Sequence, residues 1–313
     1  MQDALDKFSR EAEQIIASFR KNLESQKPPP IIYHYTDAGG LRGILETGQL
    51  WLTDIFNLND PSELSHGFSH GVKVLDSMVA NGPPEGKVFA ERLAGFAHQR
   101  GIQESAHFFV CSFTSWGDDL GQWRAYADNG RGYALGFDAN ALEKTFAGIG
   151  FTKDGIPNTF SFPITYKDAE LAKIHRQIIE SMLGLISLPR GRNLQGAAIN
   201  SYMTELSVWL MVHMLHAAVF FKHEGYYNEK EYRFLQMYMA GELPEMKRRA
   251  RRCSLINYKE FDWKSGATGA LKQIVVGPAA DREKARHFAE DCLRLFYTGT
   301  ATITHSDIPY RAA

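Results

Sequence analysis

The spacing of apolar residues predicts several helices along the chain. Residues 2–26 are expected to form an amphipathic helix that ends at the run Pro28 to Pro30, because their apolar side chains recur at helical spacing. Residues 38–47 are expected to form a shorter helix, with Asp37 as its N-cap and Gly48 as the residue that ends it. Further helical stretches are expected over 70–100 with a break at Gly82-Pro83-Pro84, over 167–187, over 198–222 and over 281–297.

Short runs rich in β-branched and aromatic residues predict strands between these helices, and a helical turn is expected over 119–127. The expected strands cover residues 31–36, 49–53, 107–114, 131–137, 161–166, 232–237, 273–276 and 301–305. Because strands occur near both ends of the chain, one sheet is expected to unite residues 28–313 in a single α+β domain. Residues 1–27 then form an N-terminal amphipathic helix in front of that domain.

One apolar stretch, residues 206–221, contains no formal charge and invites comparison with a membrane span. It is shorter than the roughly 20 residues that cross a bilayer. His213 and His216 also lie inside it. We therefore expect a buried core helix there and no membrane partner.

Composition and charge exclude some classes of protein. The three cysteines, Cys111, Cys253 and Cys292, are too widely spaced for a disulfide framework or a CxxC zinc site. The first 27 residues lack the continuous apolar core of a secretory signal, so we expect a cytoplasmic protein. A formal net charge of −1 provides no overall field for nucleic acid or anionic lipid.

Three short polar segments at strand ends carry the candidate chemistry. They are His34-Tyr35-Thr36, Ser112-Phe113-Thr114 and the pair Glu229 and Glu231. Ser112 and Thr114 share one face of a strand, as do the two glutamates where the next strand begins. Two carboxylates so close together repel each other, so a polar or cationic ligand would ease the arrangement. Each segment also has a local interpretation: backbone hydrogen bonds, solvent-facing hydroxyls, or a charged turn with Arg233 paired to an acid.

Other segments suggest substrate contacts. The loop with Asn59, Asp60 and Glu63 is either a turn started by Asp-Pro or a substrate loop beside a cleft. Arg124 and Tyr126 could bind a phosphate and stack on a base, or could support a corner of the core. The basic run Lys247 to Arg252 is expected in a loop, where it either meets solvent or contacts a nucleic-acid phosphate.

A metal-dependent nuclease is one alternative function. Glu63, His66 and His70 would share one face of a helix at a spacing that suits a metal. The neighbouring Gly67 and Gly71 disfavour a stable helix, so we expect no metal site.

The chain resembles a bacterial family known as domain of unknown function 2971, through segments spread over residues 31–310. The matching segments are Tyr33 to Thr36, Phe56 to Glu63, Ser112 to Thr114, Gln122 to Tyr126, Gly130 to Phe137, Glu229 to Arg233 and Ile274 to Pro278.

More distantly, the order His-x-Thr, Ser-x-Thr and Glu-x-Glu resembles the active-site layout of the ADP-ribosyltransferase superfamily. That resemblance implies a split β-sheet that holds NAD in a cleft, with surrounding helices. It also implies an enzyme that transfers ADP-ribose to an unknown macromolecular acceptor, protein or nucleic acid, or that hydrolyses NAD. A non-enzymatic nucleotide- or protein-binding module remains the main alternative.

The resemblance implies specific roles for the candidate residues. Glu231 would stabilise the ribosyl cation and Glu229 would orient the acceptor. His34 would bind the adenosine ribose of NAD. Ser112 and Thr114 would form the floor of the cleft. Phe113 or Tyr126 would take the place of a stacking tyrosine. The remaining implied contacts to NAD are Tyr35, Thr36 and Arg124, and Asn59, Asp60 and Glu63 would form the substrate loop.

Overall fold

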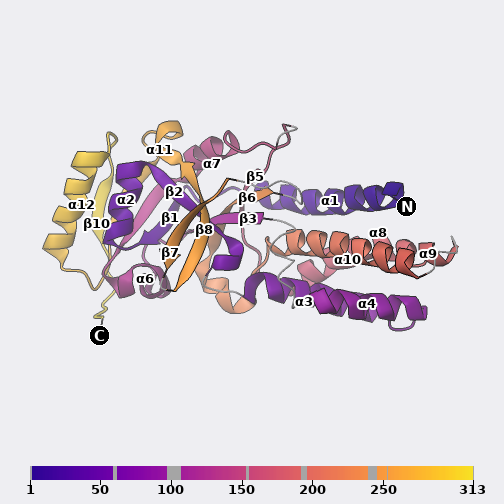
Figure 1. Ribbon diagram of the computed structural model, residues 1–313. Coiled ribbons are helices and arrows are strands. Elements are labelled where there is room, and N and C mark those ends of the chain that lie inside the picture. The colour runs from indigo at the N-terminus through magenta and orange to yellow at the C-terminus, as the bar shows by residue number, and fades with distance from the viewer. Residues whose placement is uncertain are drawn as a thin grey trace.

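One mixed sheet and a layer of long helices make up the fold (Figure 1). The computed structural model describes residues 2–58, 62–96, 107–152, 155–191, 196–238, 245–251 and 253–312. Within these ranges the chain forms ten strands and eleven α-helices. The protein therefore has the expected α+β class.

The sheet takes strands from both ends of the chain, as expected, in the order β10-β9-β4-β1-β3-β2-β8-β7, with β6 on β3 and β5 on β6. The neighbouring strands are antiparallel except β9 and β10, which run parallel and are connected by helix α12 (Arg282–Phe296). The strands are β1 (Ile31–Thr36), β2 (Gln49–Asp54), β3 (His107–Thr114), β4 (Tyr133–Asp138), β5 (Thr159–Pro163), β6 (Glu231–Tyr238), β7 (Lys247–Arg251), β8 (Ser254–Asp262), β9 (Leu271–Val276) and β10 (Thr302–His305).

Strand β3 is the point at which the sheet opens. One edge of β3 pairs with β6 over its whole length, from His107 to Thr114. The other edge pairs with β2 at Phe109 and Val110 and with β1 at Thr114. Strands β1 and β2 thus meet β3 at opposite ends, and the described sheet has no registered partner on this edge for residues 111–113.

Ten of the described helices cover the sheet in two groups, each with its own apolar core, and α6 (Leu120–Tyr126) packs on a third, smaller cluster. The first group extends away from the sheet in Figure 1 and packs on β3, β5 and β6. It consists of α1 (Gln2–Glu24), α3 (Ser62–Val79), α4 (Pro84–Phe96), α8 (Asp168–Ile186), α9 (Leu188–Gly191) and α10 (Ala197–Ala218). The second group is α2 (Ala38–Thr47), α7 (Ala139–Ala147), α11 (Trp263–Gly266) and α12 (Arg282–Phe296).

Helix α10 is the expected buried helix. Its second half, from Leu206, is apolar on nearly all sides, and the helix packs against α1, α3 and α8. His213 and His216 are both buried within that layer. In the described part of the chain, no helix is long and apolar enough to cross a membrane.

Helix α2 shows how local sequence sets the strand ends that surround the opening. Asp37 is the N-cap, and its carboxylate accepts a hydrogen bond from the Gly40 N–H at 2.7 Å. Gly48 ends the helix at φ 70°, a left-handed conformation that glycine adopts without strain. The chain then turns directly from β1 through α2 into β2, as the sequence predicts.

Several elements differ from the sequence-based expectation, which also lacked strand β8 and the short helices α9 and α11. Helix α3 begins at Ser62, so the expected loop up to Glu63 is shorter and the expected helix at 70 starts earlier. The basic run Lys247 to Arg251 is the edge strand β7, paired with β8, and not a loop. A run of basic residues does not look like a strand in the sequence, although edge strands often carry basic side chains that prevent pairing with other chains. Helix α7 follows β4 directly and was not expected.

Candidate functional site

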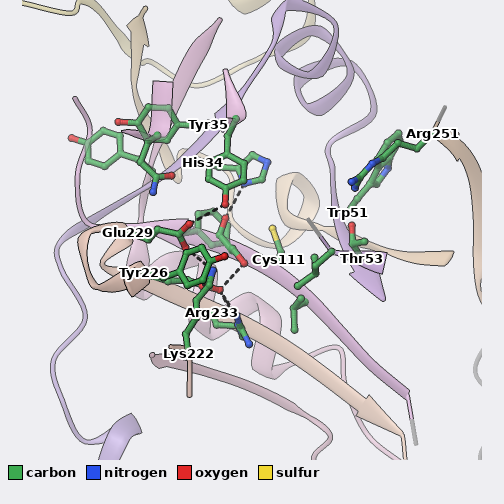
Figure 2. Close-up of a pocket in the computed structure, with 18 of the residues that line it drawn as sticks. His34, Tyr35, Trp51, Thr53, Cys111, Lys222, Tyr226, Glu229, Arg233 and Arg251 are labelled. Atoms are coloured by element: carbon green, nitrogen blue, oxygen red, sulfur yellow. Dashed lines mark hydrogen bonds and ion pairs between the residues drawn. The ribbon is translucent and has the colours of Figure 1, made fainter. Parts of the chain in front are cut away.

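A pocket of about 300 Å³ lies where the sheet opens between β1, β2 and β3 (Figure 2). Its size is at the lower end of the range for ligand sites. Residues from seven parts of the chain meet there: Tyr33, His34, Tyr35, Trp51, Thr53, Leu58, Val110, Cys111, Ser112, Phe113, Gln122, Tyr126, Lys222, Tyr226, Glu229, Glu231, Arg233, Arg249 and Arg251. Gln122 and Tyr126 come from the short helix α6 (Leu120–Tyr126).

Glu231 is the buried carboxylate of this pocket. Alternation along β6 places Glu231 and Arg233 on one face, and the register with β3 brings Ser112 opposite Arg233. The Ser112 hydroxyl donates to Glu231 Oε1 at 2.7 Å. The Arg233 Nε donates to the same oxygen at 2.8 Å, and the Lys222 ammonium lies 3.1 Å from Oε2.

These partners keep Glu231 ionised. Burial alone would raise the pKa of Glu231, but the positive charges of Arg233 and Lys222 and the bond from Ser112 hold it below its ordinary value. The two carboxylate oxygens differ in their number of polar partners, because Oε1 contacts Ser112 and Arg233 whereas Oε2 contacts Lys222. A carboxylate accepts about four hydrogen bonds in all. Oε2 therefore retains acceptor capacity for a ligand hydroxyl.

Glu229 shares a cation with Glu231. Lys222 is 2.6 Å from Glu229 Oε2 and 3.1 Å from Glu231 Oε2, so one ammonium bridges the two acids. The Tyr126 hydroxyl donates to Glu229 Oε1 at 3.1 Å. Glu229 is the last residue of the 3-10 helix η3 (Glu224–Glu229), and only Lys230 separates it from β6. The repulsion expected between the two acids is thus relieved by a lysine from the chain itself.

His34 faces the open edge of β3. Its Nδ1 lies 3.1 Å from the Ser112 carbonyl oxygen, within the segment where β3 has no registered strand partner. Burial lowers the pKa of His34, so the imidazole is neutral at pH 7. Neutral imidazole bonded to a carbonyl through Nδ1–H leaves Nε2 as an acceptor. His34 and Glu231 therefore contact the same residue, Ser112, from its backbone and side chain respectively.

Two further polar groups in the pocket are occupied or unreactive. The Tyr35 hydroxyl donates to the Trp116 carbonyl at 2.9 Å and accepts from the Asp119 N–H at 3.1 Å, and burial raises its pKa. Burial also raises the pKa of the Cys111 thiol to about 12. Because the thiolate is the nucleophilic form, Cys111 is inert at neutral pH.

The structure brings most of the predicted residues together. His34, Tyr35, Ser112, Phe113, Tyr126, Glu229 and Glu231 all line the pocket.

Three predicted residues lie outside the pocket lining. Thr114 shares a face with Ser112, but the sheet closes onto β1 there, and its buried hydroxyl accepts from the Trp116 N–H at 3.1 Å. Thr36 lies further along β1, paired with Tyr133 of β4. Arg124 is on the solvent side of α6, because the buried face of that helix is formed by Gln122 and Trp123.

The predicted substrate loop cannot be placed. Asn59 and Asp60 lie outside the described residues, as does the side chain of Glu63.

Comparison with known proteins adds one match. Residues 122–234 match a family model described as Protein of unknown function (DUF2971). The matched segment runs from α6 to the middle of β6, so it contains Tyr126, Lys222, Glu229 and Glu231. No curated protein and no solved structure matches the chain. The resemblance to ADP-ribosyltransferases therefore rests on the residues quoted from the sequence alone.

Sequence reasoning missed several residues of the pocket. Lys222 follows the buried helix α10 by four residues, and nothing in its surroundings marks it as a partner of two acids. Arg249 and Arg251 belong to the basic run that was expected in a loop as a possible phosphate contact, so their place on one face of a strand beside this pocket was not expected. Trp51 lies on an expected strand, but only the structure shows that it stays 43% exposed beside the pocket.

The histidines of the alternative metal site have other neighbours. His66 Nε2 lies 3.9 Å from Asp168 Oδ1, and His70 Nδ1 lies 3.4 Å from Nδ1 of His175. Among the side chains that the structure describes, no group of three or more potential ligands is arranged to hold a metal.

Proposed function

We propose that the pocket binds NAD and that the protein cleaves the nicotinamide–ribose bond, transferring ADP-ribose to an acceptor or to water. The observation that carries the proposal is Glu231, a buried and ionised carboxylate whose Oε2 retains acceptor capacity. It stands where the sheet opens, and His34 contacts the same serine from the other strand.

The chemistry of the bond explains why such a carboxylate is needed. Nicotinamide leaves as a neutral molecule with the electron pair of the C–N bond, so positive charge develops on the ribose ring. The acceptor oxygen then bonds to C1′ and releases its proton. The transition state resembles that of glycoside hydrolysis. A fixed anion beside the ribose is most stabilising when that charge is greatest, so it lowers the barrier more than it tightens ground-state binding.

The neighbouring residues suit subsidiary roles. Glu231 Oε2 would accept from a ribose hydroxyl, and Glu229 would orient the acceptor. Of the two candidates for stacking on nicotinamide, Tyr126 fits better, because it is 38% exposed whereas Phe113 is buried against other aromatic rings. Neutral His34 would exchange hydrogen bonds with the adenosine ribose.

The sheet geometry also supports the proposal. Strands β1 and β2 diverge along one edge of β3, and the pocket occupies that divergence. A cleft in a split sheet is the kind of NAD site that the sequence resemblance implies.

One observation favours a second candidate, a binding module without chemistry. Both oxygens of Glu231 are held by cations, Arg233 at Oε1 and Lys222 at Oε2. A carboxylate neutralised in this way is also what a purely structural ion network requires.

The deciding experiment incubates pure protein with NAD and measures free nicotinamide, with and without cell extract as a source of acceptor. Calorimetric titration with NAD is run on the same preparation. Release of nicotinamide supports the enzyme. Binding without release under either condition favours the binding module. Absence of both overturns the NAD assignment.

A further inference from the structure

We infer that Arg249 and Arg251 of β7, together with Trp51 of β2, form a phosphate-binding subsite at one side of the pocket. The three residues all line the pocket. In Figure 2 Arg251 and Trp51 lie on the opposite side of the pocket from Glu229, Tyr226 and Lys222. Because the proposed reaction uses the same pocket, the subsite rests on the proposed function and specifies which chemical group of the ligand lies where.

The two sides of the pocket differ in charge. The side at Glu231 is balanced, since its acids Glu229 and Glu231 face Lys222 and Arg233. The side at β7 carries the two guanidinium groups of Arg249 and Arg251, and Arg251 Nη1 also donates to the Asn57 carbonyl at 3.4 Å. A ligand whose anionic phosphates lie away from its reacting sugar matches this distribution of charge.

Among the described residues, Arg249 contacts an aromatic ring but no acid. It forms no ion pair with any residue that the structure describes, and its Nε is buried without a hydrogen-bond acceptor. Burial lowers its pKa, and the nearby charge of Arg251 lowers it further. A half-buried guanidinium that lies beside a like charge, and whose buried Nε has no acceptor among the described residues, is stabilised when an anion joins it.

Strand geometry explains why both arginines reach the pocket. Side chains at i and i+2 share one face of a strand and stand roughly 6–7 Å apart. Arg248 lies between them, projects to the opposite face, and donates from Nε to Asn257 Oδ1 at 3.3 Å. Arg248 therefore provides a control with the same charge on the same strand.

Trp51 adds a ring-binding surface beside the charges. The Arg249 guanidinium carbon lies 4.8 Å from the centre of the Trp51 ring, and Trp51 remains 43% exposed. An arginine held against an exposed aromatic face is suited to a phosphate joined to a nucleoside, because the ring stacks on a base while the guanidinium binds oxygens. The phosphate can belong to a mononucleotide in the pocket or to a nucleic-acid acceptor crossing its mouth.

Calorimetric binding tests the subsite independently of the reaction. ADP, adenosine, inorganic diphosphate and a mixed-sequence single-stranded DNA oligonucleotide are titrated into wild-type protein and into Arg249→Gln, Arg251→Gln and Arg248→Gln. We expect Arg249→Gln and Arg251→Gln to weaken a phosphate-bearing ligand about tenfold or more, as expected for loss of a charge-assisted hydrogen bond. The affinity of every variant for adenosine should change less than threefold. The affinity of the Arg248→Gln protein for the phosphate-bearing ligands should also change less than threefold.

The two ligand arms identify the source of the phosphate. If the Arg249→Gln and Arg251→Gln proteins lose affinity for ADP and diphosphate, the phosphate belongs to the ligand in the pocket. If they lose affinity for the oligonucleotide alone, the phosphate belongs to a nucleic-acid acceptor. Equal weakening by Arg248→Gln overturns the subsite, as does tighter binding of adenosine than of every phosphate ligand to wild type. A protein that binds ADP through Arg249 but releases no nicotinamide refutes the proposed reaction and retains the subsite. Nicotinamide release that neither arginine variant changes supports the proposed reaction and refutes the subsite.

Discussion

At the scale of single residues, the pocket depends on a short chain of contacts centred on Ser112. Its hydroxyl donates to Glu231 and its carbonyl contacts His34. The sequence indicated these three positions because polar residues at strand ends are unusual in apolar runs. It did not indicate Lys222, because the approach of a lysine to two acids is set by how α10 leads toward β6 in three dimensions.

Replacing Glu231 by Gln should remove the charge and keep the shape. If Glu231 faces a ribosyl cation, nicotinamide release should fall ~10²–10³-fold while NAD binding changes little. Glu231→Asp, which keeps the charge but withdraws it, should be intermediate. Nicotinamide assays and calorimetry measure both effects.

Stability has to be followed in the same variants. Removing one partner of a buried ion pair costs about 3–5 kcal/mol, because Arg233 is left uncompensated. Thermal melting therefore accompanies each assay, and Glu290→Gln, which changes an exposed acid on α12, is the matched control. A folded Glu231→Gln protein that consumes NAD at the wild-type rate would assign the role to another group.

At the scale of elements, regular segments were predictable and charged or irregular ones were not. Helix α2 was correct to the residue, because both its ends are marked by capping residues. Strand β7 was missed, because five residues with four basic side chains do not resemble a strand in isolation. Its pairing with β8 provides the missing information, and the pocket gains two arginines from it.

Gly48→Ala should destabilise the protein through the end of α2. The residue has φ 70°, and an added Cβ would lie 2.8 Å from Cβ of Lys264. We expect a loss of about 1 kcal/mol or more, seen as a lower melting temperature. Gly43→Ala lies in the same helix with open space around it, so it should be neutral or stabilise by about 0.5–1 kcal/mol. Equal effects of the two substitutions would contradict this account.

His216→Leu should raise stability and flatten its dependence on pH. His216 is buried in α10, neither of its ring nitrogens has a described hydrogen-bond partner, and burial lowers its pKa to about 3. An unfolded histidine titrates near 6.5, so the unfolded state takes up a proton that the folded state refuses. Above pH 6.5 the histidine is neutral in both states and adds no pH-dependent cost, and below that pH the stability of the wild type falls by about 2 kcal/mol by pH 5.

Melting temperatures of wild type and His216→Leu between pH 8 and pH 5 test this sign. The gap between the two proteins should widen as the pH falls. A constant gap would show that the proton uptake occurs elsewhere, for example at His175 or His213, whose pKa values burial also lowers.

At the scale of the whole molecule, the helical layer and the sheet share contacts that no local pattern reveals. The amphipathic stripe of residues 2–26 predicted a helix correctly, but it did not identify the surface that the helix covers. In the structure α1 packs against α8, α10 and β5. The opening of the sheet is a similar case, because it depends on register between β1, β2 and β3.

Removal of residues 1–27 should therefore prevent stable folding. Helix α1 buries Leu5, Phe8, Ile16 and Leu23 almost completely. Each such side chain contributes roughly 1.5–3 kcal/mol, and a whole domain is stable by only about 5–15 kcal/mol. Size-exclusion chromatography and circular dichroism of residues 28–313 would show aggregation or loss of structure. Adding residues 1–27 as a peptide should restore solubility, and a truncated protein that melts like the full chain would refute the prediction.

Strand β7 ends the described sheet, and this position has a consequence for how molecules behave together. A terminal strand can pair with a strand of another copy, and like charges along it prevent that contact. The basic side chains of β7 therefore oppose self-association as long as no anion is bound to them. A polyanion that neutralises them should lower the barrier, so light scattering at high protein concentration should rise when diphosphate or single-stranded DNA is added and fall again with salt.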